Sequence, residues 1–178
     1  MRIISGALKG RRLIAPKKLP VRPTTDRSKE ALFNILQHQY NWEDICVLDL
    51  FTGTGSISYE FGSRGVRNIT AVDQNKRCID FVHKTSQSLN LPIQTIQMET
   101  KKYLSSVKSQ FNLIFSDPPY DLGTDNYIKL IDLIFENNIL DQDGLLIMEH
   151  GEHERFEKHL KFSESRKYGS NVFSFFKY

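Results

Sequence analysis

Short apolar runs and amphipathic stretches alternate along most of the chain. The apolar runs have the length of buried strands, whereas the amphipathic stretches repeat apolar residues three or four positions apart, which is the spacing of a helix. The runs predict strands at 46–51, 68–73, 93–98, 112–117, 144–149, 162–167 and 172–177. The amphipathic stretches predict helices at 27–39, 55–64, 75–89, 100–107, 124–138 and 152–159. This order predicts an α/β fold, in which helices cover both faces of a seven-stranded, mostly parallel sheet.

The last two predicted strands are joined by a very short connection, residues 168–171. A parallel crossover needs about a dozen residues or more, so this connection allows only an antiparallel pair. The sheet is therefore expected to end in an antiparallel C-terminal hairpin.

The first 15 residues have the pattern of a β-hairpin. Arg2-Ile3-Ile4 and Arg12-Leu13-Ile14 flank two glycines, and prolines at 16, 20 and 23 keep the following chain extended. Asp26 is expected to cap the helix that comes next. We expect residues 1–22 to form a basic N-terminal extension of a domain that covers residues 23–178.

Positive charge is concentrated in this N-terminal part. Residues 1–29 contain nine lysines and arginines but a single acid, so their formal charge is +8, whereas the whole chain carries +3. A basic end on a mildly acidic body favours binding of a polyanion. The alternative is a basic segment that is simply solvated.

The overall composition is that of a water-soluble domain. Hydrophobic residues make up 39% of the 178 residues, and no apolar run approaches the ~20 residues of a membrane span. The start of the chain does not have the pattern of a signal peptide, so we expect a cytoplasmic protein. Cys46 and Cys78 are expected to be reduced core residues, because two cysteines form neither a metal cluster nor a disulfide framework.

Candidate binding residues lie where the predicted strands end, because ligands of parallel sheets bind at the carboxyl ends of the strands. Asp49 lies inside the first strand, which runs into a turn with two glycines, and Asp73 ends the second strand. Gly53 and Gly55 allow the backbone to approach a ligand closely. Asp73 is placed to bind the hydroxyls of a ribose, or else to cap the next helix. Glu99 likewise could accept a hydrogen bond from an adenine amine or cap a helix. The turn after the first strand does not have the Gly-x-Gly-x-x-Gly pattern of dinucleotide-binding proteins, because Ser58 stands where the third glycine is needed.

The most specific motif is Asp117-Pro118-Pro119-Tyr120, directly after a buried strand. Two prolines remove two backbone donors and stiffen the exit of the strand, so the carboxylate and carbonyl groups face the site as acceptors. This arrangement suits a ligand with an amino group, and the ring of Tyr120 offers a stacking surface for a base. The alternative is a rigid turn with a surface tyrosine.

These motifs resemble the class I S-adenosylmethionine-dependent methyltransferases, and more narrowly the bacterial 16S rRNA guanine-N2 methyltransferase (RsmD-like) family. The resemblance covers nearly the whole chain. It rests on the segments 2–6, 9–11, 22–27, 30–34, 48–55, 63–65 and 117–120. It implies a Rossmann-like methyltransferase fold and transfer of a methyl group from S-adenosylmethionine to N2 of a guanine in small-subunit rRNA, as in enzymes that modify guanine 966.

The resemblance also implies roles for individual residues. It assigns catalysis to Asp117, Pro118, Pro119 and Tyr120. It assigns cofactor binding to Asp49, Phe51, Thr52, Gly53, Gly55, Asp73, Gln74, Met98, Glu99 and Asp117. It assigns contacts with rRNA to Arg2, Lys9, Arg11, Arg12, Arg22, Thr25 and Arg27. The expected partner is the small ribosomal subunit or its assembly intermediate, and the expected protein is a monomer without membrane association.

Two other functions remain open at this point. The same chemistry could act on another base, such as adenine N6 in DNA or RNA, and the scaffold could be a non-catalytic RNA-binding assembly factor. A metal site is not expected, since His150 and His153 among nearby glutamates match no zinc spacing. We expect both histidines to be solvated residues at the start of a helix.

Overall fold

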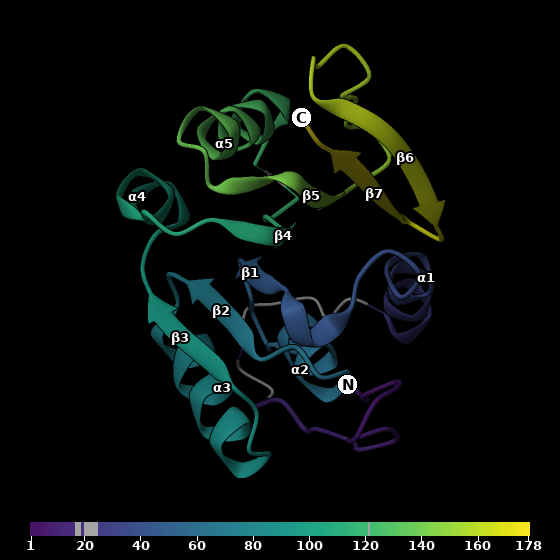
Figure 1. Cartoon of the computed structure of the whole chain (residues 1–178), viewed down its shortest axis with the longest axis vertical. Coiled ribbons are helices and arrows are strands. Elements are labelled where there is room, and N and C mark those ends of the chain that lie inside the picture. Colours follow the sequence, from purple (N-terminus) through teal and green to yellow (C-terminus); the bar gives the residue numbers. More distant parts are fainter. Residues whose placement is uncertain (17–18, 20–24, 121) are drawn as a thin grey trace.

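A seven-stranded sheet runs through the molecule in the order β3-β2-β1-β4-β5-β7-β6 (Figure 1). The structure is a computed structural model, and it describes residues 1–16, 19, 25–120 and 122–178. Its strands are β1 (Cys46–Leu50), β2 (Asn68–Asp73), β3 (Ile93–Gln97), β4 (Phe111–Ser116), β5 (Leu140–His150), β6 (Phe162–Tyr168) and β7 (Asn171–Phe176). Neighbours among β1–β5 pair in parallel, whereas β7 pairs antiparallel with both β5 and β6. The predicted parallel sheet with an antiparallel C-terminal hairpin is confirmed.

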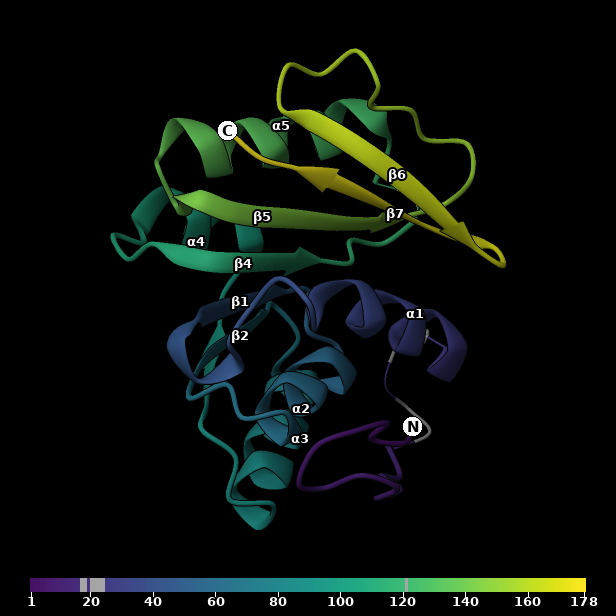
Figure 2. The same ribbon diagram turned by 45° about the vertical axis from the view of Figure 1, so that its right-hand side comes forward.

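In the described residues, α-helices cover both faces of this sheet (Figure 2). They are α1 (Asp26–Leu36), α2 (Ser56–Ser63), α3 (Lys76–Ser88), α4 (Thr100–Ser106) and α5 (Thr124–Glu136), and a 3-10 turn, η1 (Trp42–Asp44), precedes β1. Helices α1, α2 and α3 pack in one hydrophobic cluster, and α4 and α5 pack in the other. Alternate residues of one strand supply both clusters. Val47 joins the first and Leu48 the second, as expected for a sheet covered on both faces.

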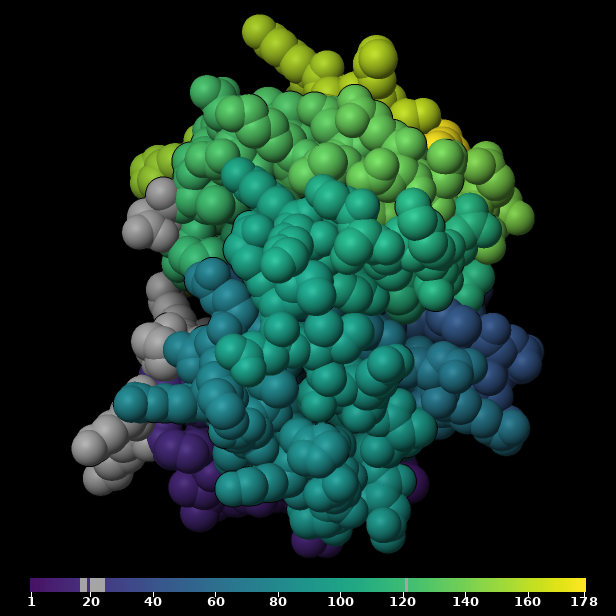
Figure 3. Space-filling view, turned by 90° about the vertical axis from the view of Figure 1, so that its left-hand side faces the viewer, coloured from purple at the N-terminus to yellow at the C-terminus, as the bar shows by residue number. Residues whose placement is uncertain are grey.

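Different parts of the chain occupy the two ends of the long axis of the molecule. The N-terminal segment lies at the end opposite to α5 and the C-terminal hairpin (Figures 1 and 2). In the space-filling view, atoms of the α3–α4 region fill the middle of the face, with α5 above and the N-terminal segment below (Figure 3).

Two predicted elements near the C-terminus were wrong. Residues 152–159 form turns instead of a helix, because Phe156 is the single apolar side chain in that stretch and no apolar face can form. Phe156 is buried against Tyr127 and Phe176. Strand β5 begins at Leu140, not at residue 144, and the polar residues 141–143 concealed its first part. The other predicted boundaries differ from the structure by up to three residues.

The predicted N-terminal hairpin is present only as a short antiparallel contact. Arg2 and Arg12 form a single bridge, which the hydrogen bonds from Ile3 N to Arg11 O (3.0 Å) and from Leu13 N to Met1 O (3.0 Å) flank. The pairing goes no further because the amides of the next residues, Ile4 and Ser5, donate to a carboxylate on α2 instead. Ile3 itself is buried in the core.

The start of α1 also differs from expectation. Thr25 is the N-cap, and its hydroxyl oxygen accepts from the amide of Ser28 at 3.1 Å. Asp26 is instead the first helical residue and pairs with Arg2 at 3.3 Å. The expected domain boundary between residues 22 and 23 lies outside the described residues, so the division of the chain stays a prediction.

The N-terminal segment is fixed to the last turn of α2 by Ser63. Its carbonyl accepts from Ala7 N (2.7 Å), while its hydroxyl accepts from Leu8 N (3.0 Å) and donates to Ser5 O (2.6 Å). Gly6 lies between these contacts with a φ of +82°. A Cβ at this position would lie 1.9 Å from the carbonyl oxygen of Ser63. The backbone here can therefore approach the helix only because residue 6 is glycine.

We expect Gly6→Ala to destabilise the protein by roughly 2 kcal/mol or more, because the clash adds to the cost of a positive φ. Chemical denaturation of the variant measures this loss. Gly10→Ala is the matched control, since Gly10 has a φ of +83° but no atom within 4 Å of the added Cβ. Equal losses in the two variants would show that the contact with Ser63 has no energetic weight.

Candidate active site

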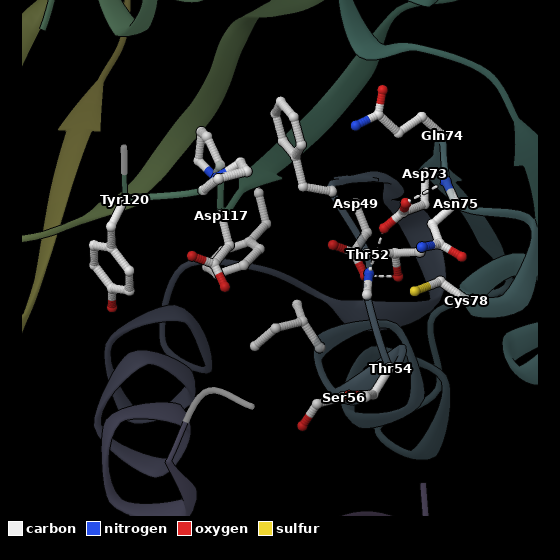
Figure 4. Close-up of a pocket in the computed structure, with 16 residues that line it drawn as sticks. Asp49, Thr52, Thr54, Ser56, Asp73, Gln74, Asn75, Cys78, Asp117 and Tyr120 are labelled. Carbon is white, nitrogen blue, oxygen red and sulfur yellow. Dashed lines mark hydrogen bonds between the residues drawn. The ribbon is translucent and has the colours of Figure 1, made fainter. Parts of the chain in front are cut away.

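A cavity of about 500 Å³ opens at the carboxyl ends of β1, β2 and β4 (Figure 4). Its walls come from the turn after β1, from the turn between β2 and α3, and from the segment after β4. The lining residues are Asp49, Phe51, Thr52, Gly53, Thr54, Ser56, Ile57, Asp73, Gln74, Asn75, Cys78, Phe115, Asp117, Pro118, Pro119 and Tyr120. The three strand ends singled out in the sequence therefore meet around one cavity.

The glycine turn is held in place by Asp73. Its Oδ2 accepts from the amide of Gly53 at 2.9 Å, and its Oδ1 accepts from the amide of Asn75 at 2.8 Å. Gly53 and Gly55 have φ values of 53° and 77°, which side chains rarely adopt. Asn75, not Asp73, is the N-cap of α3. The carboxylate of Asp73 thus joins the first two strand ends and also lines the cavity.

Asp49 is buried beneath the same turn. Its Oδ2 accepts from the hydroxyls of Thr52 (2.7 Å) and Ser58 (2.5 Å). Burial raises the pKa of Asp49 to about 6, although these hydroxyl contacts act in the opposite direction. Asp49 therefore orients the turn through two side chains, and at neutral pH it contributes a negative charge to the base of the cavity.

This raised pKa predicts a pH-dependent stability. Below about pH 6 the folded state binds a proton on Asp49 that the unfolded state, with its ordinary carboxyl pKa, binds only near pH 4. The free energy of unfolding should therefore rise by up to about 3 kcal/mol, relative to Asp49→Asn, as the pH falls from 7 to 4. Denaturation of both proteins across this range measures the difference.

Asp80→Asn is the control, because the contribution of Asp80 to stability should change with pH in the opposite direction. The ion pair with Lys76 lowers the pKa of the exposed Asp80, so its stabilising contribution is lost as the pH falls. A stability difference between the wild type and Asp49→Asn that stays constant from pH 7 to 4 would contradict the raised pKa of Asp49.

The Asp117-Pro118-Pro119-Tyr120 motif forms the wall opposite to Asp73. The amide of Asp117 donates to Leu50 O at 3.3 Å, which attaches the end of β4 to the end of β1. Pro118 is buried, and Tyr120 is 41% exposed. Figure 4 shows the side chains of Asp117 and Tyr120 extending to the same side of this segment. A carboxylate and an aromatic ring thus stand next to each other at the mouth of the cavity.

Three of the expected cofactor residues do not line the cavity. Gly55 faces Tyr59 and Val82, which an added Cβ would meet, and Met98 packs against the cluster that contains α4 and α5. Glu99 is the N-cap of α4, and its carboxylate accepts from the amides of Lys101 and Lys102, both at 3.1 Å. The helix cap that was the alternative for Glu99 is therefore observed, and its contact with adenine stays a prediction.

The residues expected to contact rRNA lie on the surface where the structure describes them. Arg2, Lys9, Arg11, Arg12, Thr25 and Arg27 are exposed. Arg22 lies outside the described residues. These side chains are available to phosphates, and their contacts with rRNA stay a prediction.

Sequence reasoning missed six residues that line the cavity, namely Thr54, Ser56, Ile57, Asn75, Cys78 and Phe115. Thr54 and Ser56 could have been identified from the sequence, because each is adjacent to one of the glycines of the turn.

Cys78 comes from α3, and burial raises the pKa of its thiol to about 11, so it stays protonated and is a poor nucleophile. Cys78 is buried as expected, whereas Cys46 is half-buried, and both are free.

A second missed feature is a buried ionic cluster next to the cavity. Lys29 on α1 is only 1% exposed, and its ammonium donates to Arg2 O (2.7 Å) and to Ser56 Oγ (3.1 Å). Glu60 on α2 is fully buried, with its carboxylate 3.7 Å from Lys29 Nζ. Burial lowers the pKa of Lys29, and the charge of Glu60 opposes this shift. Through Ser56, the cluster reaches the wall of the cavity.

The carboxylate of Glu60 also binds the N-terminal segment. It accepts from Ile4 N (2.8 Å) and Ser5 N (3.0 Å), and from Arg64 Nε at 3.0 Å. Charged donors and amides thus satisfy both oxygens, as a buried carboxylate requires. The N-terminal segment, α1 and α2 are joined by this one group.

The expectation for His150 was wrong. His150 is buried at the end of β5, where its ring nitrogens bond to Ser174 Oγ (2.7 Å) and Gly151 O (2.8 Å), and burial lowers its pKa. His153 is exposed.

Within the described part of the chain, no three histidine, cysteine or carboxylate side chains are arranged to hold a metal ion. Likewise, none of the described helices has the length and apolar character needed to cross a membrane.

A family model described as Conserved hypothetical protein 95 matches residues 1–177. The chain belongs to this family. The resemblance that the motifs indicated is thereby confirmed, since curated relatives of the chain carry the name ribosomal RNA small subunit methyltransferase D.

Members of known name are similar to this chain over most of its length. The Bacillus subtilis protein named "Putative rRNA methyltransferase YlbH" is 35% identical over 156 residues, which are 84% of this chain and 82% of that protein. Ribosomal RNA small subunit methyltransferase D of Haemophilus influenzae is 32% identical and covers 84% of this chain and 78% of its own. The solved structure titled "Putative methyltransferase yhhF from Escherichia coli" superposes with a TM-score of 0.85 at 27% identity, covering 99% and 96% of the two chains. The family therefore has the Rossmann-like methyltransferase fold, as expected.

Proposed function

We propose that this protein transfers a methyl group from S-adenosylmethionine to the exocyclic N2 amine of a guanine in small-subunit rRNA. One observation carries the proposal: the Asp117-Pro118-Pro119-Tyr120 motif lines the same cavity as the glycine turn and Asp73. The names of the relatives, which are rRNA methyltransferases, support the choice of substrate.

The cavity has the properties of a site for a positively charged nucleoside. Its volume of about 500 Å³ is in the range of small-molecule sites. Asp49, Asp73 and Asp117 supply carboxylates to its lining, while Phe51 and Phe115 supply apolar surface. When bound, S-adenosylmethionine supplies a methyl group on a sulfonium. Asp73 would hold the ribose hydroxyls, and the turn at Gly53 would allow the backbone close to the ligand.

The segment after β4 would bind the acceptor base. The carboxylate of Asp117 and the carbonyl of Pro118 would accept hydrogen bonds from the exocyclic amine, which directs the nitrogen lone pair toward the methyl group. The ring of Tyr120 would stack on the base. Alignment of this kind can lower the barrier by as much as ~7–11 kcal/mol, and Asp117 would also stabilise the positive charge that develops on nitrogen.

The exposed basic residues of the N-terminal segment would hold phosphates of the rRNA. Arg2, Lys9, Arg11 and Arg12 are exposed, as is Arg27 in the first turn of α1, and Arg2 reaches that turn through its ion pair with Asp26. Phosphate contacts position the RNA but do not read its sequence. Specificity for one guanine would therefore come from the cavity and from the shape of the RNA around the target.

The test is methylation of small-subunit rRNA that lacks the modification, with labelled S-adenosylmethionine and mass spectrometry of the nucleosides. Free rRNA and assembled subunits serve as separate substrates. We expect N2-methylguanosine in at least one of them. Methylated adenine instead would identify an adenine-N6 enzyme. RNA binding without any methylated nucleoside would indicate a non-catalytic assembly factor.

A further inference from the structure

Tyr120 forms a wall between two hollows of the surface. It lines the main cavity and also a smaller groove, whose other lining residues are Gly151, Glu152, His153 and Ser170. The orientation of this ring therefore sets the shape of the cavity mouth next to Asp117. A side chain that is 41% exposed needs contacts of its own to keep one orientation.

Two contacts from the C-terminal half of the sheet hold this ring. The hydroxyl of Tyr120 donates to Asn171 Oδ1 at 3.4 Å. The edge of the ring lies against Gly151, where an added Cβ would be 3.4 Å from Tyr120 Cδ1. The ring thus has a polar contact at its tip and a packing contact along one edge.

The side chain of Asn171 has its orientation fixed by Glu149. Asn171 Nδ2 donates to Glu149 Oε1 at 2.5 Å, and the two residues are only 5% and 1% exposed. An ionised carboxylate can only accept hydrogen bonds, so the amide nitrogen must face Glu149 and the amide oxygen must face away. That oxygen accepts from Tyr120 and also from Ser170 Oγ at 3.2 Å. Glu149 therefore determines which atom of Asn171 is presented to Tyr120.

The backbone under these two residues is rigid. Glu149 lies near the end of β5 and Asn171 begins β7, and the antiparallel pairing of His150 with Val172 connects the two strands at this point. The pairing of β5 with β7 therefore brings a buried carboxylate and a buried amide to the side of the acceptor site, about 30 to 50 residues from Tyr120 along the chain.

We propose that Asn171 and Glu149 are positioning residues, which hold the Tyr120 ring as a fixed stacking wall for the planar base that accepts the methyl group. This inference rests on the proposed function, because it assigns Tyr120 to the acceptor base. It gives the pairing of β5 with β7 a role in the reaction, although neither residue lines the main cavity.

A double-mutant cycle tests the connection. Tyr120→Phe keeps the ring and removes its hydroxyl, while Asn171→Leu removes the acceptor. Each single change is expected to lower kcat/KM for the RNA by about three- to tenfold, with the KM for S-adenosylmethionine unchanged. The double variant should lose about as much as one single variant, because both changes remove the same contact. Glu149→Leu, which removes the group that accepts from Asn171 Nδ2, should also lower kcat/KM, and it serves as the second variant should Asn171→Leu fail to fold.

Tyr178→Phe is the matched control, since its hydroxyl donates to Phe135 O at the same distance of 3.4 Å and the residue is 39% exposed. It should leave kcat/KM unchanged. Losses that multiply in the double variant, or full activity of Tyr120→Phe, would overturn the proposal.

Spectra of protein labelled in the tyrosine rings provide a readout that does not need activity. The Tyr120 signals should change in Asn171→Leu and in Glu149→Leu but not in Tyr178→Phe, and unchanged signals would also overturn the proposal. Wild-type protein that methylates no guanine in rRNA would remove the proposed function, while the spectra would still decide whether the two residues position Tyr120.

Discussion

Replacing Asp117 with alanine is expected to lower the rate of methyl transfer by about 10²- to 10³-fold, which is the usual cost of removing one group that stabilises developing charge in a transition state. Asp117 lines the cavity at the end of β4, where it would both orient the exocyclic amine and stabilise the charge on nitrogen. Single-turnover methylation of rRNA measures the rate.

The loss should lie in the chemical step and not in assembly of the complex. Affinity for RNA should be retained, because the basic side chains of the N-terminal segment are unchanged. Asp125→Ala is the control, since Asp125 is an exposed acid in the first turn of α5. If Asp117→Ala transferred methyl groups at the rate of the wild type, the assignment of the acceptor site would have to be abandoned.

Lys29→Met should produce the largest loss of stability of any single change considered, roughly 3–5 kcal/mol, because breaking a buried ion pair leaves its partner charged in the interior. The partner here is Glu60, which is fully buried, and the change also leaves Arg2 O and Ser56 Oγ without the Lys29 donor. Chemical denaturation measures the free energy of unfolding.

The double variant Lys29→Met/Glu60→Gln should not recover this loss, since Glu60 keeps its ion pair with Arg64 after the first change and the second change would take that carboxylate from Arg64. Lys76→Met is the control on the surface, where Lys76 and Asp80 form an exposed pair that water and salt screen, so its loss should change the stability little. Similar losses for Lys29→Met and Lys76→Met would show that burial of the first pair has no energetic consequence.

The strands of this fold could be predicted because their signal is local. A run such as Val47–Leu50 alternates between two hydrophobic clusters, so every apolar side chain in it is buried and the run is continuous in the sequence. The first part of β5 is different. Its polar residues 141–143 belong to the strand because Leu140 pairs with Phe111. This partner lies almost thirty residues away in the sequence, so no local pattern reveals the pairing. The predicted helix at 152–159 was wrong because the charged residues of this stretch do not provide an apolar face that could pack on the sheet.

The residues of the candidate site likewise differ in whether a local sequence pattern reveals them. Asp73, Asp117 and the glycines could be found because they follow strands, and parallel strands bring their ends together. Lys29 and Glu60 could not be found, since lysine and glutamate are almost always exposed and only the tertiary packing of α1 on α2 buries them. Asn171 was assigned to a turn, and its contact with Tyr120 arises only from the pairing of β5 with β7.

The attachment of residues 4–8 to α2 limits how this chain can be engineered. A deletion or insertion that displaced Ile4 and Ser5 would take two backbone donors from a carboxylate in the interior.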